Sequence, residues 1–193
     1  YQTKKPVGEV LMEALPGTLL LAFAAMAIAV LIGIPLGVLA AVKQNTWMDT
    51  SAVFASIVGI SAPSFFMAII MAYLFGFVWS DWTGLHITGS WFDIDSEGTR
   101  RLSLQNLILP AVTLGIRPMA IITQLTRSAM LDVLDQDYIR TAYAKGLSRR
   151  TVIWKHALRN ALNPVITAIT GWFAELLAGA FFTFYATRFL ANE

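Results

Sequence analysis

The chain has 193 residues, of which 56% are hydrophobic and only 13% are charged. Soluble domains usually carry about a quarter charged residues, so this composition excludes an ordinary soluble fold and favours an all-α, polytopic membrane protein. A net charge of +2 is too small to indicate nucleic acid binding, and the lack of cysteine excludes disulfides and thiol chemistry.

The first part of the chain predicts a polar external segment, residues 1–16, followed by two membrane spans. Residues 17–42 and 52–78 carry no charge, and each run exceeds the roughly 20 apolar residues that cross a bilayer. In the first run Gly33, Pro35 and Gly37 favour tight packing or a kink over a ligand site. In the second run the break at residues 61–64, with its proline, is typical of a bent span. Residues 43–49 are predicted to form a polar hairpin between the two spans.

Residues 79–105 are polar and predict an external surface loop. Tryptophans at the start of this loop are expected at the level of the lipid headgroups. The run Asp93-x-Asp95-x-Glu97 has the spacing of calcium ligands but lacks the rest of the calcium-loop signature. We therefore expect no metal site there and interpret the loop as a surface that contacts an external protein.

Residues 106–130 and 164–184 predict a third and a fourth span, the third broken at Arg117-Pro118. Arg117 and Glu175 are charges in the interior of the predicted spans, and both fall near mid-membrane at a rise of ~1.5 Å per residue. A charge there costs at least ~2.5 kcal/mol, so each should face a partner or water. Two hypotheses stay open: the two side chains pair and hold the spans together, or one of them lines a translocation path.

Between these spans lies a basic segment, residues 131–163, which predicts two short helices joined by a hinge. Asp137 is placed to cap the first helix, which runs to about Lys145, and Gly146 supplies a left-handed residue that ends it. Ser148 is placed to cap the second helix, which carries one apolar face. Such a pair predicts either an interfacial helix on anionic lipid or a docking surface for a cytoplasmic partner.

The basic residues also predict the topology. Eight of them lie on the same side of the membrane as this segment and four lie on the opposite side, so the side with eight should be cytoplasmic. These eight are Lys43, Arg127, Arg140, Lys145, Arg149, Arg150, Lys155 and Arg159.

Catalytic chemistry is not indicated anywhere in the chain. There is no glycine-rich phosphate loop ending in Gly-Lys-Ser/Thr, so the chain cannot supply ATP hydrolysis. The two histidines, His86 and His156, are far apart and have no neighbours at ligand spacing. We therefore predict no catalytic residue, no metal and no cofactor.

The basic segment resembles the cytoplasmic Glu-Ala-Ala signature of ABC-transporter permeases. Residues 140–142, Arg-Thr-Ala, occupy the signature position, Gly146 follows at the expected offset, and Asn163-Pro164 stands at the closing pair. The sequence of this segment is similar to that of permeases of the oligopeptide/dipeptide branch, and in particular to their B-type subunit. Arg140 replaces the acid and Asn163 replaces an apolar residue. The resemblance extends from about Pro6 to Phe182.

This resemblance implies a type I ABC importer transmembrane domain with four spans present of a probable six, in a bacterial or archaeal cytoplasmic membrane. The subunit would couple ATPase closure to alternating access for peptides or similar small solutes. Its partners would be a homologous permease, two ATPase subunits, an external solute-binding protein and the bilayer. Residues 186–193 depart from the family pattern and are interpreted as a divergent or truncated tail of a longer protein.

The resemblance also assigns the basic segment to ATPase docking. The implied docking residues are Tyr138, Arg140, Thr141, Ala142, Ala144, Lys145, Gly146, Leu147, Ser148, Arg149 and Arg150. Two alternatives stay open: a nickel or glutathione importer of the same branch, and a membrane scaffold that does not transport.

Overall fold

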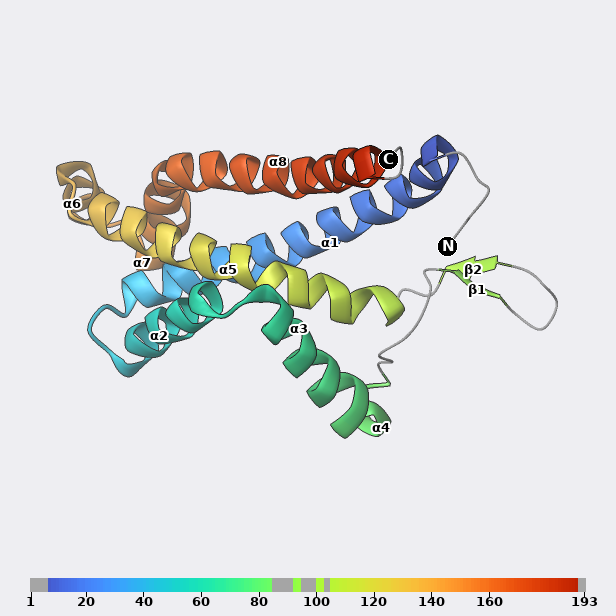
Figure 1. Cartoon of the computed structure of the whole chain (residues 1–193). Helices are drawn as coiled ribbons and strands as arrows, with labels where there is room; N and C mark the ends of the chain where they lie inside the picture. The colour runs from blue at the N-terminus through green and yellow to red at the C-terminus, as the bar shows by residue number, and fades with distance from the viewer. Residues whose placement is uncertain (1–6, 85–91, 95–99, 103–104, 191–193) are drawn as a thin grey trace. The chain divides into compact units, whose positions relative to one another are not determined.

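The computed structural model describes residues 7–84, 92–94, 100–102 and 105–190, with side chains described for residues 15–84 and 106–175. This described part of the chain is helical, with one short hairpin (Figure 1), and the all-α fold class is confirmed. In chain order the elements are α1 (Val7–Val42), α2 (Trp47–Ser61), α3 (Ser64–Tyr73), the π-helical η1 (Leu74–Val78), α4 (Ser80–Thr83), β1 (Phe92–Ile94), β2 (Arg100–Leu102), α5 (Gln105–Leu134), α6 (Asp137–Ala144), α7 (Arg149–Thr151), the π-helical η2 (Val152–Ala157) and α8 (Leu158–Leu190).

Membrane spans are recognised by length and apolar composition. Among the described residues two helical segments meet both requirements, Leu15–Val42 and Asn106–Leu134. A third is added if α2 and the helix that follows it, broken at Ala62-Pro63, count as one span, and this break is where the sequence predicts a bend. The fourth predicted span, 164–184, lies within α8 and runs past residue 175, beyond which no side chain is described.

Several predicted boundaries differ from the observed helix ends. α1 begins at Val7 instead of residue 17, and α5 continues through Arg117-Pro118, which the sequence predicts as a break. α8 likewise contains Pro164 within a continuous helix. A proline removes one backbone hydrogen bond, and a transmembrane helix tolerates this loss where neighbouring groups satisfy the exposed carbonyl. The predicted loop 79–105 is also more regular than expected, because β1 and β2 pair antiparallel, with Phe92 opposite Leu102.

The chain divides into two compact units, each described here by itself. The first unit comprises residues 1–25, 64–114 and 172–193, and the second comprises residues 26–63 and 115–171. Aromatic contacts mark the first unit: the ring centroids of Phe23 and Phe173 lie 4.8 Å apart, and those of Phe75 and Trp79 lie 5.2 Å apart, edge to face. The second unit holds the basic segment and is the one considered below.

Small residues let α1 and α5 pack closely in the second unit. A methyl group built on Gly37 would lie 2.6 Å from the carbonyl oxygen of Thr123, and one on Gly33 would lie 3.0 Å from that of Met119. On α2, a methyl group on Gly59 would lie 3.1 Å from Cβ of Ala120. Backbones approach this closely only where one partner lacks a side chain. The expectation that Gly33 and Gly37 serve tight packing is confirmed.

Candidate functional site

The hinge of the basic segment is a complete helix-ending motif. The Leu147 N–H donates to the carbonyl of Ala142 at 3.3 Å, and the Gly146 N–H donates to that of Tyr143 at 2.9 Å. Gly146 has φ +79°, the left-handed conformation that this pair of bonds requires and that glycine adopts without strain. Gly146 therefore ends α6 as the sequence predicts.

The next helix begins at once. Ser148 has extended backbone angles, and its Oγ accepts a hydrogen bond from the Thr151 N–H at 3.3 Å, so its predicted capping role is confirmed. The prediction for Asp137 is wrong, because the N-cap position is Gln136 and Asp137 is already the first helical residue. Its carboxylate still lies in the first turn of the helix, where a negative charge interacts favourably with the helix dipole.

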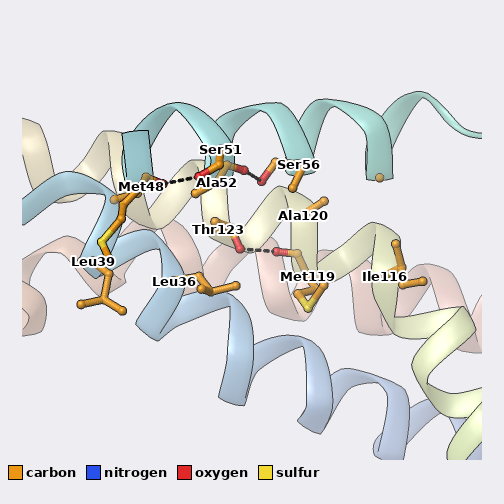
Figure 2. Close-up of a pocket in the computed structure, with 13 residues that line it drawn as sticks. Leu36, Leu39, Met48, Ser51, Ala52, Ser56, Ile116, Met119, Ala120 and Thr123 are labelled. Atoms are coloured by element: carbon orange, nitrogen blue, oxygen red, sulfur yellow. Dashed lines mark hydrogen bonds between the residues drawn. The ribbon is translucent and has the colours of Figure 1, made fainter. Parts of the chain in front are cut away.

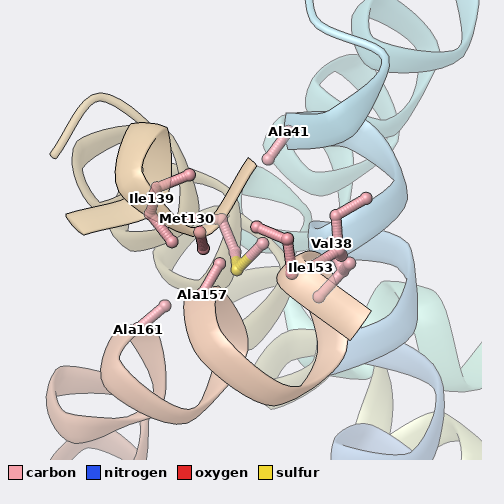
Figure 3. Packing of buried hydrophobic residues seen from close by; sticks show 9 residues of the cluster. Val38, Ala41, Met130, Ile139, Ile153, Ala157 and Ala161 are labelled. Atoms are coloured by element: carbon pink, nitrogen blue, oxygen red, sulfur yellow. The ribbon is translucent and has the colours of Figure 1, made fainter. Parts of the chain in front are cut away.

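A buried apolar cluster holds the basic segment against the rest of the second unit (Figure 3). Ile139 of α6 points into this cluster and lies beside Met130 of α5, and α1 contributes Val38 to the same cluster. The remaining members are Ala41, Ala142, Val152, Ile153, Ala157 and Ala161. Because α1, α5, η2 and α8 contribute side chains to the same cluster as α6, the tilt and rotation of α6 are restricted, since close-packed side chains leave little room to move.

The exposed face of the segment carries most of the residues that the resemblance selects. Of the eleven, ten are exposed, and Ala142 is the exception with 7% of its surface accessible. Ala142 was expected in the docking surface, but it faces the core because it lies three residues after Ile139, on the same side of the helix. Its small side chain lets α6 approach the helix beneath it.

Aromatic side chains add to this exposed face. Tyr138, Tyr143 and Trp154 each leave more than 40% of their surface accessible, as Leu147 nearly does. Tyr138 also ties α6 to α8, since its hydroxyl accepts a hydrogen bond from the amide of Asn160 at 2.8 Å. Exposed aromatics between basic residues are typical of surfaces that bind another protein. Trp154 was not selected from the sequence.

A largely buried ion pair fastens the start of α2 to the C-terminal half of α5. The Asp49 carboxylate accepts hydrogen bonds from Nε and Nη2 of Arg127, the latter at 2.8 Å, and a third from the Asn45 N–H at 3.0 Å. Asp49 is only 4% exposed. The sequence predicted a polar hairpin here and missed the pair. The one available signal was that Asp49 and Arg127 were assigned to the same side of the membrane.

Arg117 and Glu175 are both exposed in the structure. They belong to different units of the chain, so their pairing stays a prediction. Among the residues that the structure describes, no group of three or more His, Asp or Glu side chains is placed to hold a metal ion.

Comparison with known proteins gives consistent matches. The family described as "Binding-protein-dependent transport system inner membrane component" matches residues 33–188. The dipeptide transport system permease protein DppB of Haemophilus influenzae is 42% identical over 197 residues, which cover 95% of this chain and 59% of that protein. The proteins of the same name from Escherichia coli and Bacillus subtilis are each 40% identical, covering 94% and 92% of this chain. The chain spans 54% to 59% of the length of these three relatives.

Proposed function

Because the chain belongs to the family of inner membrane components of binding-protein-dependent transport systems, we propose that it is a permease subunit of an ATP-driven importer for peptides or similar small solutes. The relatives named dipeptide transport permeases support the peptide class. The proposed partners are a homologous permease, two ATPase subunits and an external solute-binding protein. ATP hydrolysis would take place in the separate ATPase subunits, and this chain would contribute the membrane path.

The observation that carries this proposal is the surface formed by residues 137–151, which we call the coupling surface. Its outer side is basic and aromatic, and its inner side is fixed to α1, α5 and η2 by the buried cluster. A surface built in this way can receive a force and pass it to the spans. In the proposed mechanism, closure of the ATPase pair displaces the coupling surface, and the attached spans tilt to switch access.

The alternative that α6 lies on the lipid surface is disfavoured by its burial pattern. An interfacial helix must place its apolar face among the acyl chains. The apolar face of α6, Ile139 and Ala142, is already buried against the protein. The side that remains accessible carries Arg140, Thr141 and Lys145 together with Tyr138 and Tyr143. This mixture of charged, polar and aromatic side chains suits a protein partner better than hydrocarbon.

Gly146 offers a test of coupling at a single position. Valine at φ +79° is strained, whereas asparagine tolerates this conformation better than other residues with a side chain. A methyl group on Gly146 would meet nothing within 4 Å, so the change acts on the hinge conformation without filling space. Gly146→Val should raise the ATP hydrolysed per solute imported in reconstituted vesicles, while membrane insertion is preserved.

Gly146→Asn is the matched control and should restore most of the coupling. Normal coupling in the valine variant would contradict the proposed role of the hinge. Substrate class requires a separate measurement, because nickel and glutathione importers would share this fold. Solute binding by the partner receptor distinguishes these classes, and failure of the chain to copurify with any ATPase would favour a scaffold.

A further inference from the structure

A groove of about 410 Å³ opens on the second unit, and none of the residues that line it belongs to the coupling surface. It is formed by α1, α2 and α5, with Met48 and Leu39 near one end and Ile116 near the other (Figure 2). The other lining residues are Leu36, Ala40, Ser51, Ala52, Ala55, Ser56, Gly59, Met119, Ala120 and Thr123. Its walls belong to segments that are apolar enough to lie in the membrane.

The polar atoms of the lining are already satisfied within their own helices. Ser56 donates to the carbonyl of Ala52 at 2.8 Å, and Thr123 donates to that of Met119 at 2.8 Å. The Ser51 hydroxyl likewise donates to the backbone one turn earlier. No hydroxyl of the lining therefore needs a partner from a ligand, and the groove favours an apolar occupant.

One end of the groove carries a positive charge. The Lys43 ammonium lies 3.2 Å from the sulfur of Met48, which lines the groove. Lys43 is exposed and has no carboxylate partner among the described residues, and the nearby acid Asp49 is paired with Arg127. Trp47, the first residue of α2 and four residues after Lys43, is 76% exposed, and tryptophan is typical of the membrane–water interface.

An apolar groove that ends in a cation and an interfacial tryptophan matches an amphiphile with an anionic head. We propose that this groove binds one acyl chain of an anionic phospholipid, with the net negative headgroup beside Lys43. A flexible acyl chain can follow such a groove along its length. The site does not depend on which solute the protein transports.

Photo-crosslinking tests this site because two of the seven methionines, Met48 and Met119, line the groove. The protein is produced with a photoreactive methionine analogue and reconstituted in phosphatidylcholine vesicles that contain a minor fraction of phosphatidylglycerol. Adducts are assigned to each methionine by mass spectrometry. Adducts at Met48 and Met119 should be enriched in phosphatidylglycerol about fivefold relative to those at Met67 on α3, since a basic residue near the surface attracts anionic lipid to that extent.

The variant Lys43→Gln should abolish this enrichment while lipid adducts persist at both groove positions. Lys155→Gln, which removes another exposed lysine from the basic side of the chain, is the matched control and should retain it. Lipid adducts without headgroup preference in the unmodified protein would overturn the proposed contact between Lys43 and an anionic headgroup. Cross-links from Met48 or Met119 to a polypeptide would show that a helix fills the groove and would overturn the proposal entirely.

Discussion

Replacing Gly37 with alanine should separate α1 from α5. The added methyl group would lie 2.6 Å from the carbonyl oxygen of Thr123 and 2.6 Å from Cβ of Thr126. Both obstacles are fixed: the first is backbone, and the second is the first atom of a side chain that is completely buried. No rotamer change removes either contact, so the two helices must move apart by several tenths of an ångström.

The magnitude follows from two opposing effects. Alanine in place of glycine within a helix gains up to about 1 kcal/mol, whereas overpacking a well-packed interface costs about 1–3 kcal/mol. Because the obstacle at Gly37 is backbone, the cost should lie at the upper end, and Gly37→Ala should lower the free energy of unfolding by about 1–2 kcal/mol. A methyl group on Gly171 in α8 would meet nothing within 4 Å, so Gly171→Ala should be neutral or stabilising.

Unfolding in mixed micelles, followed by circular dichroism, measures this difference. Gly59→Ala and Gly33→Ala should fall between the extremes, because their methyl groups would lie 3.1 Å from Cβ of Ala120 and 3.0 Å from the carbonyl of Met119. From the most to the least stable variant, the expected order is therefore Gly171→Ala, Gly59→Ala, Gly33→Ala and then Gly37→Ala. If Gly37→Ala is as stable as Gly171→Ala, close backbone packing does not hold these helices together.

Three further predictions concern charged residues and topology. Arg127→Ala should lower the free energy of unfolding by about 3 kcal/mol, because it leaves the buried Asp49 carboxylate without a partner. Asp49→Ala should cost less, because a quarter of the Arg127 side chain already reaches the surface. Equal losses of stability in the two variants would contradict this reasoning. A cysteine at Ser96, which lies outside the described residues, should react with an impermeant thiol reagent added outside, and labelling only from the cytoplasm would reverse the topology. If Arg117 and Glu175 pair, Glu175→Gln alone should impair assembly more than the double variant with Arg117→Gln, and additive losses would exclude the pair.

Local chemistry explains what could be predicted from the sequence. The hinge depends on Gly146 and Ser148, whose roles follow from the backbone conformation of glycine and the short reach of a serine hydroxyl. The bend at Ala62-Pro63 is equally local. The apolar side predicted for the second helix comprises six residues, of which Val152, Ile153, Ala157 and Ala161 are buried and Leu158 and Leu162 are partly buried.

Features that depend on long-range contacts could not be predicted from the sequence. Asp49 and Arg127 are 78 residues apart, and no local pattern indicates that one aspartate in a polar turn reaches a particular arginine. The burial of Ala142 likewise depends on what lies beneath α6. The Glu-Ala-Ala signature marks a position in the chain, and only the packing shows which of its side chains face outward.

The buried cluster bears on how a force at the coupling surface would spread. Ile139 contacts a cluster to which α1 contributes Val38 and α5 contributes Met130, so α6 cannot shift without displacing both helices or opening a cavity. Opening a cavity around a large buried side chain costs about 2–5 kcal/mol. Because Asp49 and Arg127 join α5 to the start of α2, displacement of α5 also reaches that helix. Moving α1, α2 and α5 together is therefore less costly than deforming the basic segment alone, and the second unit should respond to its partner as one body.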